Sequence, residues 1–292
     1  MELQDGFTLM HEHMTIDLSP GDLGTDSFDE LAEDLRMVYS LGVRNIVDLT
    51  NQTMGRDVEY VRRLSDATGI NIIMSTGSYL ERYIGPYVEP RTVAELKEDA
   101  VRDITEGIDG TDKKADVIGE IAWSQPEEGP LEKKAWEAWC AAALRTDAVV
   151  STHPSRGVQQ YPQAEYLISQ GIRPERIVIG HIEFSPDDDT LMKLLDTGVT
   201  IGVDMVGKLT GKSDEFRADL VRKVKGWGRL SQLILSCDIC NRPQLRVNGG
   251  NGYVYLFDTF IPMLKDRGLT DDDIRLILKD NPERILMKKQ DE

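Results

Sequence analysis

Four histidines, all that a chain of 292 residues contains, each follow a short apolar run typical of a buried β-strand. His11 and His13 form a His-x-His pair at the end of FTLMHEH, His153 ends AVVSTH, and His181 ends RIVIGH. Imidazole is the commonest protein ligand for zinc and similar ions. The carboxyl ends of strands are also where α/β folds place their chemistry. The pattern therefore predicts a metal-dependent enzyme.

Two carboxylates accompany these histidines. Asp238 ends the run QLILSCD, and Glu120 stands inside the apolar run VIGEIAW. A buried carboxylate is costly unless it is paired or bound to a metal. Residues two apart in a strand share a face, so we expect His11 and His13 to project together while Glu12 points outward to the covering helices. Two carboxylates and four imidazoles at one end of a sheet predict a site for two divalent ions, with Glu120 as the bridge.

Strand-like and helix-like segments alternate along the chain and must position these ligands. We expect strands at 7–13, 43–50, 70–75, 116–121, 147–153, 176–181, 199–204 and 232–238. Helix-like segments lie at 27–40, 56–67, 93–108, 131–144, 159–170, 187–197, 213–227, 254–267 and 271–279. Near-continuous apolar strands, each followed by a helix, predict parallel strands covered on both faces. Eight such units close into an α/β fold, the (β/α)8 TIM barrel, with the metal site at the carboxyl ends of the strands. An open doubly wound sheet is the competing architecture.

Length and charge limit the class of protein. A chain of 292 residues fits one barrel domain spanning 1–292, because barrels of this class run to about 250 residues or more. The net charge of −17 leaves no basic stripe for nucleic acid or for an anionic membrane surface. The sequence shows neither an apolar stretch of about 20 residues nor a signal peptide. We therefore expect a cytoplasmic protein with a small-molecule substrate and no nucleic-acid or membrane partner; a homodimer stays open as its assembly.

The three cysteines give less evidence about function than the histidines do. Cys237 and Cys240 form a Cys-x-x-Cys around Asp238, but no second such motif accompanies them. We expect these residues to pack structurally, with redox chemistry as the alternative. Three cysteines cannot all pair, which agrees with a reducing cytosol. A nucleophilic cysteine would lack a histidine to activate it, since all four are candidate ligands.

The ordered ligand set resembles the phosphotriesterase-related family of the amidohydrolase superfamily. His-x-His after the first strand, a bridging group on the fourth, histidines after the fifth and sixth and aspartate after the eighth form that superfamily's pattern. The segments TLMHEHMTIDLS, GVRNIVDLTNQTMGR, STHPS, VGKL and NGGNGYVYLFDTFIP extend the resemblance over essentially the whole chain. Phosphotriesterase itself bridges its metals with a carboxylated lysine, whereas VIGEIAWS offers Glu120 in that place. Glu120 is shorter, which argues against phosphotriester hydrolysis as the native activity.

The resemblance also implies roles for single residues. His11, His13 and Asp238 would hold the deeper ion. His153 and His181 would hold the more exposed one, and a hydroxide bridging the two ions would be the nucleophile. Asp238 would be the catalytic residue that accepts the proton and delivers it to the leaving oxygen. Zinc is the first expected metal, and manganese, cobalt or iron would fit the same ligands.

Substrate choice is expected from the loops that follow the strands. Lys208 follows the seventh strand and Arg242 lies four residues past Asp238, so these cations would suit a phosphate or carboxylate tail. Tyr253, in the same long loop as Arg242, and Tyr79, after the third strand, are further candidates for substrate contact. Because relatives in the family hydrolyse lactones, including phosphorylated sugar lactones, the resemblance implies a hydrolase of a small ester, a lactone first. A phosphoester hydrolase and a catalytically idle metal-binding or ligand-binding barrel are the alternatives.

Overall fold

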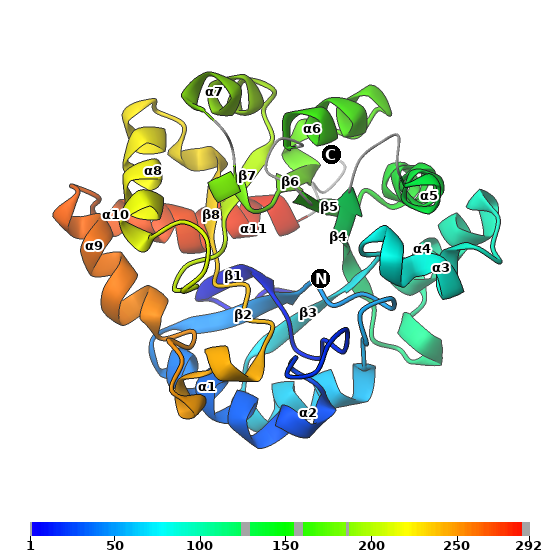
Figure 1. The fold of residues 1–292 in the computed structure, drawn as a ribbon, viewed down its shortest axis with the longest axis horizontal. Coiled ribbons are helices and arrows are strands. Elements are labelled where there is room, and N and C mark those ends of the chain that lie inside the picture. The colour runs from blue at the N-terminus through cyan, green and yellow to red at the C-terminus, as the bar shows by residue number, and fades with distance from the viewer. Residues whose placement is uncertain (1, 124–128, 155–159, 185–186, 288–292) are drawn as a thin grey trace.

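The structure, a computed structural model, describes residues 2–123, 129–154, 160–184 and 187–287. Within these ranges the strands form one parallel sheet in the order β1 to β8, and Figure 1 shows them at the centre with the helices arranged around them. The strands are β1 (Phe7–Glu12), β2 (Val43–Asp48), β3 (Asn71–Thr76), β4 (Ala115–Trp123), β5 (Val149–Pro154), β6 (Ile177–Ile179), β7 (Thr200–Val203) and β8 (Leu233–Leu235). The predicted (β/α)8 barrel is confirmed.

Helices follow each strand and cover the outside of the barrel. They are α1 (Phe28–Ser40), α2 (Val58–Thr68), α3 (Glu81–Val88), α4 (Val93–Thr105), α5 (Pro130–Thr146), α6 (Gln160–Ser169), α7 (Asp188–Asp196), α8 (Asp214–Gly226), α9 (Ile261–Asp266), α10 (Asp271–Arg275) and α11 (Asn281–Leu286). Two π-helical segments, Leu256–Phe260 and Leu276–Asp280, lead into α9 and α11 where longer regular helices were expected. The short helix α3 was not predicted. None of the helices in the described ranges could cross a membrane.

Apolar side chains fill the fold in two places. A large cluster lies between the strands and the helices, and a smaller one includes Val47, Val117, Val178 and Ile234 from four of the strands. Residues of α11 pack against the smaller cluster, and the Arg176 guanidinium, just before β6, binds a carbonyl of α11. Helix α11 therefore closes the amino-terminal end of the barrel, which leaves the carboxyl ends of the strands for the site.

The barrel closes between β8 and β1 through a serine hydroxyl. The Ser236 Oγ accepts hydrogen bonds from the backbone N–H groups of Met10 and His11, at 2.8 and 2.9 Å. The N–H of Asp238 reaches the carbonyl of His11 at 3.3 Å. Because buried N–H groups need acceptors, Ser236 takes the role that a backbone carbonyl has elsewhere in the sheet.

Glu12 completes this closure. Its two carboxylate oxygens accept from the N–H groups of Cys237 and Ile239, at 2.7 and 3.0 Å. The side chain is fully buried. The expectation that Glu12 points toward the covering helices is therefore wrong: it turns sideways to the segment after β8, where two buried N–H groups require an acceptor.

Candidate metal centre

The carboxyl ends of five strands bring all six predicted ligands together. β1 carries His11 and ends one residue before His13, β4 carries Glu120, and β5 carries His153. The remaining two, His181 and Asp238, follow β6 and β8. Five of the six are buried, and the His153 side chain is the most open, at 16% exposure. The sequence pattern therefore predicted a real convergence of side chains.

Strands β6 and β8 end earlier than expected, because His181 and Asp238 leave the extended conformation. Their φ angles are +51° and +50°, in the left-handed region. That region costs a non-glycine residue about 1–2 kcal/mol, and residues held there cluster at functional sites. The turn at His181 is held by its own N–H, which donates to Asp204 at 3.0 Å.

Glu120 lies at the centre of the cluster. Its Oε2 is 3.2 Å from His11 Nε2 and 3.0 Å from His153 Nδ1. Its other oxygen, Oε1, is 3.4 Å from His13 Nε2. Asp238 Oδ1 faces the same imidazoles, 3.3 Å from His13 Nε2 and 3.9 Å from His11 Nε2. Because Glu120 Oε2 is also 3.9 Å from His181 Nε2, this one carboxylate faces all four imidazoles through its two oxygens.

Glu120 is shared by two groups of potential ligands. In each group the ligand atoms lie within 4.8 Å of one another: His11, His13 and Glu120 in one, and Glu120, His153 and His181 in the other. His153 Nδ1 and His181 Nε2 are 2.9 Å apart. A carboxylate common to two imidazole pairs is the arrangement that a bridge between two ions requires.

Asp204, just after β7, was not predicted to belong to the site. Its Oδ2 lies 3.0 Å from His11 Nδ1, and its Oδ1 lies 2.7 Å from His181 Nδ1. An imidazole that donates one ring N–H to a carboxylate presents the lone pair of its other nitrogen. Asp204 therefore directs the Nε2 atoms of both rings at the cluster. The signal was in the sequence, since the run VTIGVD ends in aspartate as QLILSCD does.

The other two histidines have neutral partners. His13 Nδ1 is 3.1 Å from the Thr50 hydroxyl, which leaves Nε2 for the cluster. His153 Nε2 is 3.4 Å from the Tyr79 hydroxyl, so Nδ1 is its inward nitrogen. Each of the four imidazoles thus has one nitrogen facing the ligand cluster and the other facing an outer partner.

The environment of His11 Nε2 indicates whether metal ions fit the cluster. His11 Nε2 is buried, and among the described residues it makes no hydrogen bond of acceptable geometry, although Glu120 Oε2 lies 3.2 Å away. Such an atom is costly unless something binds it. Four imidazole nitrogens and two carboxylates are a donor set that suits zinc, cobalt, manganese or iron. The residues therefore fit two divalent ions.

The carboxylates of the cluster are held in their charged form. Burial alone would raise the pKa of Glu120, but His153 and His11 outweigh it and hold the pKa well below its usual range. Burial likewise opposes ionisation of Asp238, and the Lys208 ammonium, followed by His13, outweighs it, so this pKa is also lowered. Both groups are thus anionic at neutral pH, as metal ligands must be.

Two of the four predicted substrate contacts lie at the cluster. Lys208 Nζ donates a hydrogen bond to Asp238 Oδ2, on the side away from the imidazoles. The Tyr79 ring packs edge-on against His153, with ring centres 4.9 Å apart. Both side chains therefore border the metal centre.

The other two predicted contacts point elsewhere. The Arg242 guanidinium donates to Glu30 at 2.7 and 3.0 Å and to Asp26 at 2.8 Å, on the loop and helix after β1. Tyr253 is fully buried in the apolar cluster between strands and helices. The structure therefore does not bring Arg242 or Tyr253 to the metal centre: Arg242 is engaged by two carboxylates, and Tyr253 has no exposed surface.

The fold and the ligand cluster together define a metal-dependent hydrolase of the barrel type. A model of the phosphotriesterase family matches residues 2–286. The chain therefore belongs to the phosphotriesterase family, and it is an enzyme, a hydrolase of ester bonds.

Individual relatives match over nearly their full length. The chain is 35% identical to the phosphotriesterase homology protein of Escherichia coli over 284 residues, 96% of this chain and 97% of that protein. The crystal structure of that protein, with phosphate in its active site, aligns with a TM-score of 0.91 over 97% and 99% of the two chains, at 34% identity. A mutant of a phosphotriesterase-like lactonase from Deinococcus radiodurans aligns at 0.86 and 28% identity, over 98% and 97%. The aryldialkylphosphatase of Saccharolobus solfataricus is 28% identical, over 96% of this chain and 94% of that protein.

Proposed function

We propose that this protein is a dinuclear metal-dependent hydrolase of a small ester, with a lactone as the first substrate class. The observation that carries the proposal is the position of Glu120 between two pairs of imidazoles. His11, His13 and Asp238 would hold one ion and His153 with His181 the other. Zinc is the proposed metal, because imidazole and carboxylate suit it.

Two divalent ions, when bound, supply a nucleophile from water at neutral pH and polarise the carbonyl of an ester. Side chains of the protein would accept the proton and deliver it. Asp238 is the proposed proton acceptor, because Oδ1 faces the imidazole cluster while Oδ2 is held by Lys208. Lys208 thereby keeps the carboxylate charged and fixes its direction, so that a proton taken up at Oδ1 can pass to the leaving oxygen.

Tyr79 is the proposed orienting group. Its hydroxyl borders His153, the most exposed of the six ligands, which is the side from which a substrate can approach. A phenol there can donate a hydrogen bond to the ester as it enters. Tyr79 would thus help to direct the carbonyl toward the cluster.

The relatives' names support an ester substrate and leave a second candidate. The Deinococcus relative is described as a lactonase, whereas the Saccharolobus relative is named for hydrolysis of an aryl dialkyl phosphate. A phosphoester hydrolase is therefore the second candidate function. The third, a barrel that binds metal or a ligand without turnover, is opposed by the presence of five of the ligands in two adjoining groups, with Asp238 3.3 Å from His13 beside them.

A screen of metals and substrates tests the proposal. The protein is stripped with a chelator, reloaded separately with zinc, manganese, cobalt or iron, and assayed on γ-butyrolactone, phenyl acetate and a phosphotriester. We expect lactone hydrolysis that disappears on chelation and returns with metal. Turnover of the phosphotriester alone would favour the second candidate. Metal binding without turnover of any ester would support the idle barrel.

The proposal includes a small-molecule substrate and a cytoplasmic location. The location is supported by the three cysteines, Cys140, Cys237 and Cys240, which are free thiols as in proteins of a reducing compartment. We also propose a homodimer as the assembly to test, and light scattering of the purified protein would measure it.

A further inference from the structure

The short segment that leads from β7 to Lys208 lies beyond the regular part of the sheet. Its backbone N–H groups need acceptors that strand pairing no longer supplies. The Val206 N–H donates to the carbonyl of Ser236 and the Lys208 N–H to the carbonyl of Met205, each at 3.2 Å. The two remaining N–H groups, of Met205 and Gly207, bind carboxylates. The placement of Lys208 therefore depends on acidic side chains from other elements.

Glu183 and Asp214 are these two acceptors. Glu183, in the turn after β6, accepts from the Met205 N–H at 3.0 Å. Asp214, at the start of α8, accepts from the Gly207 N–H at 3.2 Å. The Glu183 side chain is 1% exposed and the Asp214 side chain 11% exposed. Carboxylates with so little contact with water are costly unless a cation pairs with them.

Arg217, one turn further along α8, is the cation that both carboxylates share. Its side chain is fully buried. Its Nη1 donates to Asp214 Oδ1 at 2.6 Å, and its Nε lies 3.4 Å from Glu183 Oε1, an ion pair without hydrogen-bond geometry. A guanidinium carries five N–H donors in fixed directions, so it can face two carboxylates at once. Arg217 thus holds the acceptors at both ends of the segment.

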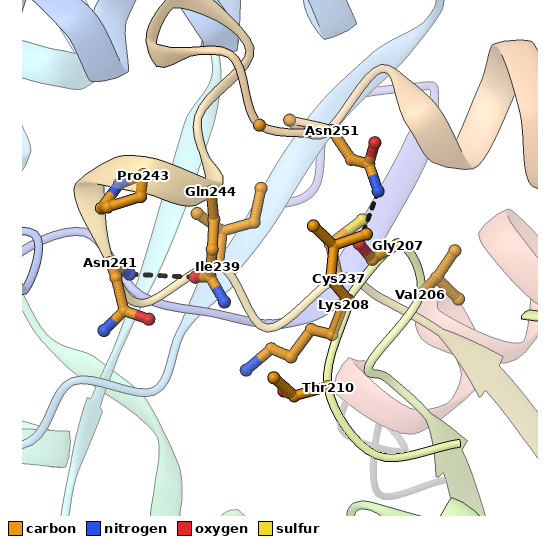
Figure 2. A pocket seen from close by; sticks show the side chains of 13 residues that line it. Val206, Gly207, Lys208, Thr210, Cys237, Ile239, Asn241, Pro243, Gln244 and Asn251 are labelled. Atoms are coloured by element: carbon orange, nitrogen blue, oxygen red, sulfur yellow. Dashed lines mark hydrogen bonds between the residues drawn. The ribbon is translucent and has the colours of Figure 1, made fainter. Parts of the chain in front are cut away.

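Gly207, the residue before Lys208, is fixed on its other sides as well. Its carbonyl accepts from Asn251 Nδ2 at 2.7 Å, a bond that Figure 2 marks. A Cβ at Gly207 would lie 3.0 Å from the Tyr255 ring, and φ is +81°, a conformation that favours glycine. Lys208 therefore starts from a fixed backbone, and its Nζ donates to Asp238 Oδ2.

We propose that Arg217 is a positioning residue for the reaction, which acts through Asp214 and the backbone of Gly207 to hold Lys208 against Asp238. The inference rests on the proposed ester-hydrolase function, in which Lys208 fixes the direction of the proton acceptor. Arg217 would affect turnover only through these contacts, because its own side chain is buried behind the loop.

Acetylation of lysines measures the placement of Lys208 without an assay of activity. Zinc-loaded protein is treated with N-hydroxysuccinimide acetate, and mass spectrometry gives the rate at each lysine. Arg217→Lys keeps the charge but loses the planar fork that serves two carboxylates. We expect Lys208 to react about tenfold faster relative to the exposed Lys193, because a hydrogen bond between charged groups shifts an equilibrium by about that factor or more.

Lys113 distinguishes a local change from general loosening of the barrel. Its ammonium donates to the carbonyl of Ile72, in β3, at 2.8 Å. Acetylation of Lys113 should be the same in Arg217→Lys as in wild type. An unchanged rate at Lys208, or an equal increase at Lys208 and Lys113, would overturn the inference.

A double-mutant cycle with Lys208→Met tests whether Arg217 acts through Lys208. The readout is kcat for γ-butyrolactone in wild type, the two single variants and the double variant. Displacement of a positioned group by about 1 Å can cost about 10²-fold, so we expect Arg217→Lys to lower kcat by about ten- to a hundredfold. In the Lys208→Met background the loss should be about twofold at most, the scatter found for independent sites. A normal kcat in Arg217→Lys, or the same loss in both backgrounds, would overturn the inference.

A matched control and a second variant complete the test. Arg222 lies on the same helix with its side chain 55% exposed, so Arg222→Lys should match wild type in acetylation and in kcat. If Arg217→Lys does not fold, Asp214→Ala takes its place, because it removes the acceptor of the Gly207 N–H and alanine suits a helix. Its acetylation and kcat should change as described for Arg217→Lys, and wild-type values of both would overturn the inference.

Acetylation and turnover together separate this inference from the proposed function. If the loaded protein hydrolyses no ester but Lys208 reacts faster in Arg217→Lys, the proposed function fails and the placement of Lys208 by Arg217 stands. If the protein hydrolyses γ-butyrolactone and Arg217→Lys changes neither acetylation nor kcat, the inference alone fails.

Discussion

Asp204 contacts two imidazoles at once, and this double contact sets which nitrogen each ring presents to a metal ion. Each carboxylate oxygen contacts a different imidazole: Oδ2 faces His11 and Oδ1 faces His181. These two histidines belong to different pairs of the cluster. One buried side chain therefore orients ligands of both proposed ions, without occupying a position in either ligand set.

The substitution Asp204→Asn tests this orientation. An amide has one accepting oxygen, so one of the two rings loses its partner. Loss of such an outer partner typically costs about 10–100-fold in metal affinity. We expect weaker zinc binding in a competition titration with a chromophoric chelator, and normal binding in Asp187→Asn, which changes the N-cap of α7 instead. Wild-type zinc affinity in Asp204→Asn would contradict the role.

Asp238 is the residue on which the proposed chemistry depends most. In Asp238→Asn the side chain keeps its size but cannot accept a proton, and general acid–base groups contribute about 10²–10⁴-fold. We expect a loss of that order in kcat for lactone hydrolysis. Metal content must be measured in the same sample, because Asp238 is also a proposed ligand. Near-normal kcat with both ions bound would mean that the proton goes elsewhere.

Residue types and spacing predicted the six ligands because each one is a polar group at the end of a buried strand. Asp204 stands at the end of the run VTIGVD in the same way, but its sequence position does not distinguish a metal ligand from a residue that orients one. The pairing of Arg242 could not be predicted from the sequence, because its partner Glu30 lies 212 positions earlier in the chain. A contact of that range follows from the closed fold and leaves no local trace in the sequence.

The contact between β8 and β1, here called the seam, both closes the barrel and positions metal ligands. The bonds of Ser236 to the N–H groups of Met10 and His11 hold the first ligand strand against the last. Asp238 follows β8 within three residues, so the seam also positions this carboxylate. Stability and metal geometry are therefore expected to change together when the seam is altered.

Ser236→Ala is the substitution that tests the seam. It leaves two buried N–H groups without their acceptor, and an unsatisfied buried group costs about 1–3 kcal/mol. We expect the free energy of unfolding in urea to fall by about 2 kcal/mol or more. Ser169→Ala, where an exposed serine donates to a carbonyl three residues away and accepts a bond of 3.5 Å from the neighbouring Gln170, should change it little. Equal stability of the two variants would show that Ser236 is dispensable.

A second element contact, at the end of α5, predicts a dependence of stability on pH. Burial tends to raise the pKa of Asp147, but hydrogen bonds from Arg176 and Arg173 outweigh it and lower the pKa below its ordinary value. A carboxyl group whose pKa is lowered on folding stabilises the protein above its unfolded pKa, near 4. That contribution is lost as the pH falls from about 4 through the folded pKa.

Asp147→Asn isolates this contribution. Asparagine tolerates the left-handed backbone at this position, where φ is +55°. The Asp147 side chain is 41% exposed, so solvent screening limits the pair to about 1 kcal/mol. Urea unfolding should show wild type more stable than the variant by about that amount at pH 7, and by less at pH 3. A difference that stays constant between these pH values would contradict the assignment to ionised Asp147.

At the scale of the whole molecule, the closed sheet brings residue 11 and residue 238 into one site. The alternation of apolar strands with helices predicted this architecture, because near-continuous apolar runs are typical of parallel strands covered on both faces. Strand ends were predicted less well at β6 and β8, where His181 and Asp238 turn out of the sheet. The net charge of −17 favours the approach of cations, which agrees with a metal centre.

Two ions that act together at one shared carboxylate should be visible in a zinc titration. Metal-free protein receives zinc in small steps, and γ-butyrolactone hydrolysis is measured after each step. If the two ions act together, activity should stay low up to one equivalent per chain, rise toward two equivalents and remain constant beyond. A plateau at one equivalent, or full activity in the metal-free protein, would contradict it.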